Sequence, residues 1–584
     1  MHEHGLHTHA ALGNYLIPML VEVGLIHDAQ VVFDKLPCRN EWSWNSLMYG
    51  YVKCGKPQHT LDLYHRMRID SLIPPSAYTI VAALKACTHL MDLRGGIDLH
   101  SEASKWGFLA ENSFISNALI DMYAKFGLLA KAQEVFDKLA TPNVVSWTVL
   151  IAGYAEHGHG NKAIQCFNRM QCEGISPDPV ALVSSLKACI NVGAVKKLDC
   201  LHAAIGRQLL LDKNLVVGNT LIDVYIKCGL LAKAQQVFDK LPLRDTVSWT
   251  TLIAGHVDHG YGEKAVQLFD HMQFEGVASD TATLVSTLKA CGSIRSRNKG
   301  RELHAEAEKQ GFLARSHAVC NTLVDMYSKC GLVAKARQIF DTLAYRDVVS
   351  WTALISGYAE CGHGEEALDC FEKMKADGVS PNATTFICGL KACSSIGAME
   401  KGEGLHVEIE RQRLLGEDAV VGTTLINMYA KCGSLSKAQE VFDRLPVRDG
   451  VAWTALMMGF AHTKQGCDMF RAFHRMLDEG IKPNIVTFLV LLSAGNQTSF
   501  SSKAKMYFEA MSEKYGIIPT LEYHTCIINS LVHAGELDKA NEVVKRMPFS
   551  PDLVLYQALL SASKSTGASD DRMEALQDVM GFYV

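Results

Sequence analysis

Two series of polar side chains recur along this chain and have the chemistry to recognise nucleic-acid bases. An Asp carboxylate can accept a hydrogen bond from the ring N–H of uracil or guanine, and an Asn amide can donate one to the bare ring nitrogen of cytosine or adenine. The first series contains only Asn and Thr: Asn14, Asn45, Asn117, Thr148, Asn219, Thr250, Asn321, Thr352, Thr423, Thr454 and Thr525. The second contains only Asn, Asp and Ser: Asn40, Ser76, Asn143, Asp178, Asp245, Asp280, Asp347, Asn382, Asp449, Asn484 and Asp552.

Both series follow an internal repeat of the sequence. The motif V-S-W-T places Trp147, Trp249 and Trp351 at intervals of 102 residues, and Trp453 continues the series. Trp44 lies one residue further from Trp147, which indicates a one-residue insertion. A fixed period over nearly the whole chain predicts a repeat array, in which each unit packs on its neighbours.

Each period divides into three repeats, which we call type 1 (35 residues, as in 144–178), type 2 (36 residues, 179–214) and type 3 (31 residues, 215–245). Apolar residues at helical spacing on either side of a Gly-containing break predict a helix–turn–helix hairpin in each. We expect one type 3 repeat at 10–40, then triplets at 41–143, 144–245, 246–347, 348–449 and 450–552. Sixteen hairpins therefore fill residues 10–552, and 1–9 are expected to be the end of a truncated repeat.

The two polar series occupy the fifth and the last residue of the type 1 and type 3 repeats. Capping explains the last position as well as base recognition does, because Asn, Asp and Ser are ordinary helix N-caps. It does not explain the fifth position, one turn into a helix, where Asn and Thr are mediocre helix formers. The type 2 repeats have apolar fifth residues, which cannot read a base edge: Val81, Val183, Val285, Ile387 and Leu489.

The chain resembles the plant-type pentatricopeptide repeat proteins of the PLS class. The matching motifs are V-S-W-T-x-L-I-x-G-Y in type 1 (P), L-K-A-C in type 2 (L), and N-x-L-I-D-M-Y-x-K-C-G with F-D-x-L-x-x-R-D in type 3 (S). Residues 553–584 resemble a partial, degenerate E motif, in which L-L-S-A matches. The resemblance implies an all-α, right-handed superhelical solenoid that reads one RNA base per repeat.

Carrying over the family's code, in which a fifth-position Asn selects a pyrimidine and Thr a purine, implies the RNA sequence 5′-Y-C-n-Y-G-n-U-G-n-U-A-n-G-A-n-G-3′. The resemblance also implies a transcript of a mitochondrion or chloroplast and a role as specificity factor for C-to-U editing. The edited C is expected a few nucleotides 3′ of the last base read. A DYW-type deaminase would act in trans.

Four lysines at position 13 of the type 3 repeats are candidates for phosphate contacts. The alternative is that the negative end of the helix dipole favours a lysine there. Glu156, Asp258 and Glu360 at position 13 of type 1 repeats interrupt any basic track. The candidates are Lys125, Lys227, Lys329 and Lys431.

We expect no catalytic residue, metal site, cofactor or small-molecule substrate. The motif H-x-E occurs at His100, His304 and His406, always in a type 2 repeat, and is interpreted as scaffold. No two cysteines stand three apart, so the C-x-x-C that completes a deaminase zinc site does not occur. The repeat-spaced cysteines are interpreted as small buried residues in a reducing compartment. His2, His4, His7 and His9 are interpreted as a ragged repeat end and not as a metal site.

The totals leave other functions open. The net charge of −5 disfavours a general nucleic-acid binder without excluding a locally basic groove, and no apolar run is long enough for a membrane span. A protein-binding scaffold, an RNA processing or stability factor without an editing role, and a non-functional fragment are the alternatives. The first residues show no transit peptide, and the N-terminus is expected to be incomplete.

Overall fold

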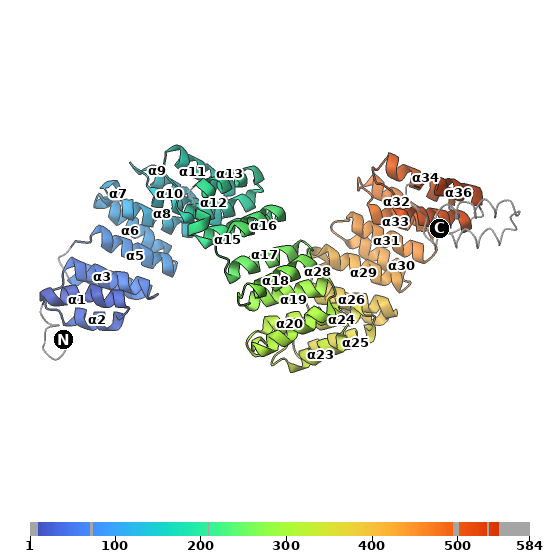
Figure 1. The fold of residues 1–584 in the computed structure, drawn as a ribbon, viewed down its shortest axis with the longest axis horizontal. Helices are drawn as coiled ribbons and strands as arrows, with labels where there is room; N and C mark the ends of the chain where they lie inside the picture. The colour runs from blue at the N-terminus through green and yellow to red at the C-terminus, as the bar shows by residue number, and fades with distance from the viewer. Residues whose placement is uncertain are drawn as a thin grey trace. The chain divides into compact units, whose positions relative to one another are not determined.

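The structure, a computed structural model, describes residues 10–70, 74–111, 113–207, 210–493, 501–533 and 536–547. All regular elements in these ranges are helices, labelled α1 to α36 (Figure 1). The chain divides into two compact units, Met1–Thr287 and Leu288–Val584. None of the described helices is long and apolar enough to cross a membrane.

The type 1 repeats each form two helices joined by a short turn. A glycine lies in the first four of these turns, and Lys464 takes its place at positive φ in the last. A cation–π or aromatic contact often accompanies the tryptophan of the first helix, as with Arg169 over Trp147. The consecutive helices are α3 (Glu41–Lys53) and α4 (Pro57–Asp70), α10 (Val144–Glu156) and α11 (Gly160–Cys172), α17 (Thr246–Asp258) and α18 (Gly262–Phe274), α24 (Val348–Glu360) and α25 (Gly364–Ala376), α31 (Gly450–His462) and α32 (Gly466–Asp478).

The type 2 repeats contain more structure than the two predicted helices. Their main helices are α5 (Ala77–Leu90) and α6 (Leu93–Lys105), α12 (Pro179–Val192) and α13 (Val195–Arg207), α19 (Thr281–Ser293) and α20 (Arg297–Lys309), α26 (Ala383–Ile396) and α27 (Met399–Arg411), α33 (Ile485–Ser493) and α34 (Ser501–Glu513). Four of these repeats end with a further helix of four residues: α7 (Phe108–Glu111), α14 (Leu210–Lys213), α21 (Phe312–Arg315) and α28 (Leu414–Glu417).

The type 3 repeats have the shortest second helices, which accounts for their shorter length. Their helices are α1 (Ala10–Val23) and α2 (Ile26–Lys35), α8 (Ser113–Lys125) and α9 (Leu129–Asp137), α15 (Leu215–Lys227) and α16 (Leu231–Lys240), α22 (His317–Lys329) and α23 (Val333–Thr342), α29 (Ala419–Lys431) and α30 (Leu435–Arg444), α35 (Leu521–His533) and α36 (Leu537–Arg546).

Within each unit, the first helix of a repeat packs on its own second helix and on the first helices of the adjacent repeats. In the first unit α8, α10, α12 and α15 are neighbours in that order, and in the second α22, α24, α26 and α29 are. The first helices thus form one layer and carry the fifth residues along it. The predicted all-α solenoid of helical hairpins is confirmed.

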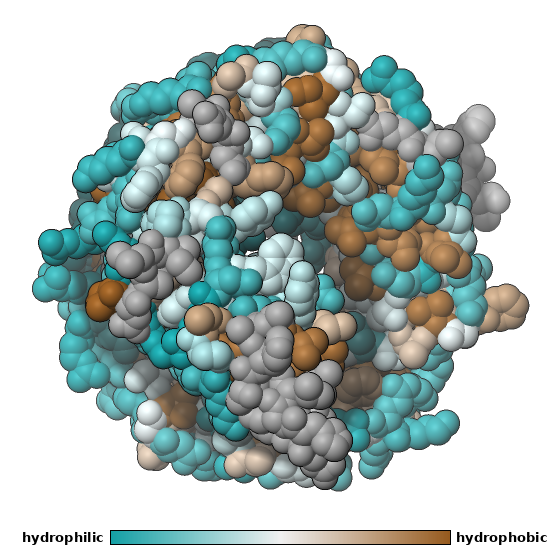
Figure 2. Space-filling view, turned by 90° about the vertical axis from the view of Figure 1, so that its left-hand side faces the viewer, coloured by the Kyte–Doolittle hydropathy of each residue, from teal (hydrophilic) through white to brown (hydrophobic). Residues whose placement is uncertain are grey.

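The motif residues form the contact between consecutive repeats. Trp147 in α10 is fully buried, and its ring packs edge-on against Phe136 of α9 with the centroids 4.4 Å apart. Gly153, six residues further along α10, lets the helix approach α8, because a Cβ there would lie 2.6 Å from the Cβ of Ala124. The side chains that repeat in sequence therefore build the core. On the face seen in Figure 2, hydrophilic residues cover much of the surface between smaller hydrophobic patches.

The histidines of the second helix in type 2 repeats join that helix to the next repeat. His100 Nδ1 lies 2.7 Å from Tyr123 Oη, and His202, His304 and His406 make the same hydrogen bond at 2.9 Å. Their tyrosine partners are Tyr225, Tyr327 and Tyr429. A scaffold role, as interpreted from the sequence, accounts for the H-x-E motifs.

We expect these four histidines to make folding stability depend on pH. Burial lowers the pKa of each below the ordinary value of 6.5. As the pH falls through that value the unfolded chain binds more protons than the folded one, so stability is lost. The melting temperature should decrease as the pH is lowered from about 7 to about 5, a range in which few carboxylates titrate. A variant with Gln at all four positions should show a flatter profile, and an equally steep one would contradict this account.

Candidate nucleic-acid interface

Within the described residues, the last residue of each type 1 and type 3 repeat caps the first helix of the following repeat. Asn143 Oδ1, for example, accepts a hydrogen bond from the backbone N–H of Ser146 at 3.0 Å. The described capping residues are Asn40, Ser76, Asn143, Asp178, Asp245, Asp280, Asp347, Asn382, Asp449 and Asn484. Type 2 repeats also end in caps, at Asn214, Ser316 and Asp418. Capping therefore accounts for the polarity of the last position in all three types.

Capping occupies only one of the two polar atoms on these Asn and Asp side chains. Asp178 Oδ1 accepts from Ala181 N at 2.7 Å, whereas no hydrogen bond from a described residue reaches its Oδ2. The same holds for Asp245, Asp280 and Asp449. An Asn cap must turn its carbonyl toward the backbone N–H, so its Nδ2 remains as a donor; this applies to Asn40, Asn143, Asn382 and Asn484. Capping and base recognition are therefore compatible.

Four fifth-position side chains hydrogen-bond directly to the cap of the next repeat. Thr148 Oγ1 donates to Asp178 Oδ1 at 3.0 Å. The other three are Asn45 with Ser76 at 3.1 Å, Asn219 with Asp245 at 3.2 Å and Asn321 with Asp347 at 3.3 Å. Residues about one repeat apart in sequence thus lie side by side on consecutive first helices, as base recognition by two side chains requires.

In three further pairs a threonine of the type 2 repeat lies between the two residues. Thr250 is hydrogen-bonded to Thr283 Oγ1 at 2.6 Å, and Thr283 Oγ1 donates to Asp280 Oδ1 at 2.7 Å. Thr385 joins Thr352 to Asn382, and Thr487 joins Thr454 to Asn484, in the same way. These threonines were not predicted from the sequence. Their signal is the recurrence of Thr at the third position of four type 2 repeats.

Four pairs are not joined by a hydrogen bond between described residues. Asn14 donates to the carbonyl of Cys38 at 3.5 Å, and Thr423 and Thr525 donate back to their own helices. Asn117 has no direct bond to Asn143 among the described contacts. The predicted partner of Thr525, Asp552, lies outside the described residues, as do residues 1–9 and 553–584.

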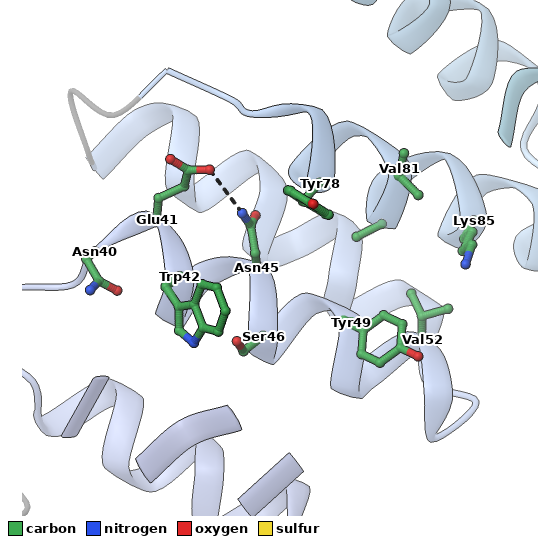
Figure 3. Close-up of a pocket in the computed structure, with 11 residues that line it drawn as sticks. Asn40, Glu41, Trp42, Asn45, Ser46, Tyr49, Val52, Tyr78, Val81 and Lys85 are labelled. Carbon is green, nitrogen blue, oxygen red and sulfur yellow. Dashed lines mark hydrogen bonds between the residues drawn. The ribbon is translucent and has the colours of Figure 1, made fainter. Parts of the chain in front are cut away.

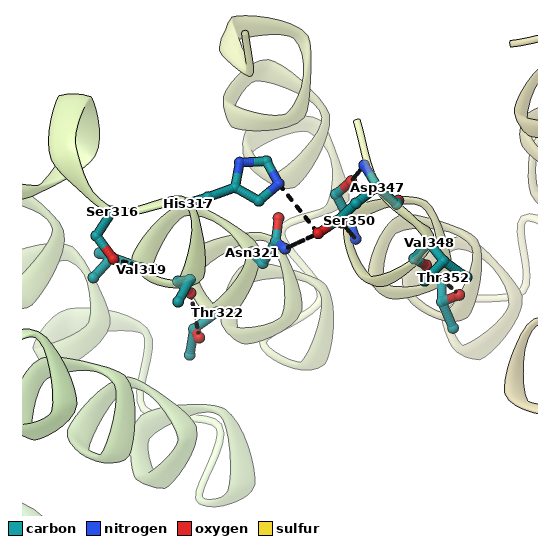
Figure 4. Close-up of polar contacts among 10 residues, drawn as sticks. Ser316, His317, Val319, Asn321, Thr322, Asp347, Val348, Ser350 and Thr352 are labelled. Atoms are coloured by element: carbon teal, nitrogen blue, oxygen red, sulfur yellow. Dashed lines mark hydrogen bonds and ion pairs between the residues drawn. The ribbon is translucent and has the colours of Figure 1, made fainter. Parts of the chain in front are cut away.

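The pair of Asn321 and Asp347 shows how the carboxylate is kept ionised (Figure 4). Burial alone would raise the pKa of Asp347, but hydrogen bonds from Ser350, the nearby His317 and Asn321 together lower it. His317 Nε2 lies 3.4 Å from Asp347 Oδ2. The pKa of Asp245 is lowered by the same balance, with Ser248 and Asn219 as donors. At neutral pH these carboxylates act only as hydrogen-bond acceptors.

The fifth-position asparagines of the type 3 repeats each bury a polar atom at an energetic cost. The Oδ1 atoms of Asn14, Asn117, Asn219 and Asn321 are buried without a described hydrogen-bond partner. A buried acceptor without a partner costs about 1–3 kcal/mol. Removing this acceptor should therefore not cost folding stability.

We therefore expect the substitution Asn117→Leu to keep or raise folding stability while weakening RNA binding. Asn117 is 8% exposed, and leucine has a similar size without the unpaired acceptor. The free energy of unfolding should increase by about 1 kcal/mol, measured by thermal or chemical unfolding. Loss of stability, or RNA binding unchanged in the same variant, would argue against a recognition role for this position.

The lysines proposed from the sequence as phosphate contacts are mostly ion-paired along their own helix. Lys125 Nζ lies 3.1 Å from Asp121, and Lys227 and Lys329 lie 2.8 Å from Asp223 and Asp325. Lys431 follows Asn427 at that spacing and has no described ion pair. All four end the first helix of a type 3 repeat. This geometry favours the alternative, stabilisation at the negative end of the helix.

A pocket of about 740 Å³ lies over Asn45 in the first triplet (Figure 3). Trp42, Tyr49 and Tyr78 line it and are 63%, 52% and 69% exposed. The wall also includes Val81 and Lys85. Sequence reasoning missed the aromatic residues because it compared only the fifth and last positions. Their signal was a Trp at the second position, where the other type 1 repeats have valine.

Comparison with known proteins gives a consistent family match. The PPR repeat family model matches residues 142–191, 244–293 and 346–395, and a pentatricopeptide repeat domain model matches 447–497. A third model, PPR repeat, matches six segments, each falling mainly within a type 1 or type 3 repeat: 42–72, 114–141, 219–245, 318–347, 423–449 and 524–550.

The similar Arabidopsis thaliana proteins are longer than this chain. The pentatricopeptide repeat-containing protein At2g33680 is 34% identical over 563 residues, which cover 95% of this chain and 76% of the relative. The chloroplastic pentatricopeptide repeat-containing protein At1g15510 is 32% identical over 554 residues, and only 63% of its length is spanned.

The solved structures that match share the fold. The pentatricopeptide repeat protein PPR10 from maize superposes with a TM-score of 0.58 at 17% identity, covering 97% of this chain and 88% of PPR10. The structure of PPR10 in complex with an 18-nt psaJ RNA element superposes with a TM-score of 0.55, also at 17% identity, covering 98% and 84%.

Proposed function

Because this chain belongs to the pentatricopeptide repeat family, we propose that it binds single-stranded RNA and selects its sequence through the paired fifth and last residues. One observation carries the proposal. The capping residues turn one polar atom into their helix and leave the other, an acceptor on Asp and a donor on Asn, beside a fifth-position side chain. A free acceptor can accept from the ring N–H of guanine or uracil, and a free donor can donate to the bare ring nitrogen of adenine or cytosine, so these atoms are sufficient to distinguish the two pairs of bases.

The aromatic pocket supports the same function at the start of the array. Unpaired bases stack on exposed aromatic side chains, and each stacked base contributes about 1–3 kcal/mol to binding. Trp42 and Tyr78 lie beside Asn45, whose side chain hydrogen-bonds to Ser76 and Thr79. A base held by its edge at Asn45 can therefore also contact a ring.

We expect RNA to quench the fluorescence of Trp42. It is 63% exposed, whereas Trp44 and the four repeat tryptophans are at most 2% exposed. The substitution Trp42→Val, which restores the residue of the other type 1 repeats, should remove the quenching and weaken RNA binding roughly 10-fold. Trp106 is also exposed, at 52%, so Trp106→Phe is the matched control and should retain the quenching. Quenching that persists in Trp42→Val would locate the RNA elsewhere.

At the level of biology, the proposed role is that of a specificity factor for C-to-U editing of an organellar transcript. Relatives with organelle names support the location: At1g15510 is described as chloroplastic and At2g03380 as mitochondrial. The C-x-x-C zinc signature of deaminases does not occur in these 584 residues. In the proposed role the deaminase acts in trans.

The experiment is to crosslink the protein to RNA in organelles and to sequence the bound transcripts. The bound sites should carry the base order implied by the paired residues, with an edited C a few nucleotides 3′ of the last base. Bound sites with that order but without editing would indicate a processing or stability factor instead. No enrichment of RNA would favour a protein-binding scaffold, whose partner binding should survive substitution of Thr250 and Asp280.

A further inference from the structure

A second set of lysines recurs in the type 2 repeats, at the ninth residue in the first helix. All four are exposed, and none makes an ion pair with any residue in the described ranges. This distinguishes them from Lys125, Lys227 and Lys329, each of which pairs with an aspartate one turn earlier. The set consists of Lys85, Lys187, Lys289 and Lys391.

These lysines lie on the same side of their helices as the fifth residue. Lys85 follows Val81 by four residues, which places both on one face of α5. Val81, Lys85 and Asn45 together line the pocket shown in Figure 3. The one carboxylate in that wall, Glu41, accepts a hydrogen bond from Asn45 at 3.4 Å. A lysine therefore stands within the same wall as a base-reading residue.

The second, third and fourth triplets repeat this arrangement in sequence, whereas the fifth has Ser493 at that position. Lys187, Lys289 and Lys391 each follow the apolar fifth residue of their helix by four positions. An apolar fifth residue cannot hydrogen-bond a base edge, so the type 2 repeats need another way to hold the nucleotide that passes them. An ammonium group without an ion pair on that face can hold the nucleotide by its phosphate, because lysine binds phosphate as a point charge.

We propose that the ninth-position lysines of the type 2 repeats bind RNA phosphate groups, so that these repeats hold the backbone while the type 1 and type 3 repeats read bases. This inference rests on the proposed RNA-binding function. In this inference the main phosphate contacts are the ninth-position lysines of the type 2 repeats and not the lysines that end the first helices of the type 3 repeats. It also explains how a chain of net charge −5 can bind RNA, since one uncompensated lysine is contributed by each of four triplets.

The test compares two triple variants that remove the same charge from the same three triplets. One carries Lys85→Gln, Lys187→Gln and Lys289→Gln, and the other carries Lys125→Gln, Lys227→Gln and Lys329→Gln. RNA affinity is measured over a range of salt concentrations. Each lost phosphate contact reduces the slope of log K against log salt by about 0.7 for a single strand. The first variant should lose about 2 from the slope and bind roughly 100-fold more weakly at about 0.1 M salt.

The second variant should keep a slope close to that of the unaltered protein. Melting curves of both variants check that the exposed substitutions leave folding intact. Equal slopes for the two variants, or a change only in the second, would overturn the inference while leaving RNA binding established. Failure of the unaltered protein to bind RNA would overturn the inference together with the proposed function.

Discussion

Replacing Asp178 and Asp280 by asparagine should convert a preference for guanine into one for adenine at the two bases these residues face. Asparagine retains Oδ1, which caps the next helix, and replaces the acceptor Oδ2 by a donor. Guanine offers a ring N–H and adenine a bare nitrogen, so the favoured partner is exchanged. A mismatched base costs about 1–3 kcal/mol, so two positions should change the relative affinity by at least about 30-fold.

This substitution separates recognition from folding. Asn and Asp cap helices about equally well, so the melting temperature should change little. Asp418 offers a matched control, because it caps α29 but is the last residue of a type 2 repeat, whose fifth residue is the apolar Ile387. The substitution Asp418→Asn should leave base preference unchanged. An unchanged preference in the double variant, with RNA binding retained, would show that the caps do not read bases.

Truncating a repeat tryptophan should cause the largest loss of stability. Trp351 is 2% exposed and its ring packs edge-on against Phe340 with the centroids 4.6 Å apart. The substitution Trp351→Ala should cost about 3–5 kcal/mol, measured by unfolding. Trp351→Phe should cost less, because an aromatic ring still fills most of the site. A loss below about 1 kcal/mol for the alanine variant would contradict the packing described here.

The same substitution should also impair recognition locally. Trp351 precedes Thr352 in α24, and each repeat of an array contacts only its neighbours. Selectivity for the base facing Thr352 and Asn382 should therefore weaken, whereas selectivity at Thr148 and Asp178 should persist. Equal effects at both positions would indicate that the array unfolds as a whole.

The repeat pattern was sufficient to predict the helical hairpins, because their apolar spacing recurs through the chain. It also placed fifth and last residues on consecutive first helices, and seven of the described pairs are joined directly or through one threonine. The four-residue helices, such as α7, were not predicted, since one turn is too short to show a period.

Other features were visible in the sequence but required comparison along a helix instead of across repeats. The ion pair of Asp121 and Lys125 is an i, i+4 pair within α8, which weakens the case for that lysine as a phosphate contact.

The aromatic pocket depends on which side chains remain exposed. Trp42 and Trp44 are two residues apart, yet one is 63% and the other 1% exposed. Only the packing of neighbouring helices distinguishes them.

The most direct measurement is the affinity of the unaltered protein for two RNAs that differ only at two bases. One carries the full implied sequence, and the other has adenine in place of guanine opposite the pairs of Thr148 with Asp178 and of Thr250 with Asp280. The account predicts that the exchange weakens binding at least about 30-fold at a fixed salt concentration. Equal affinity for the two RNAs would contradict it, because the carboxylates left free by capping would then not be reading bases.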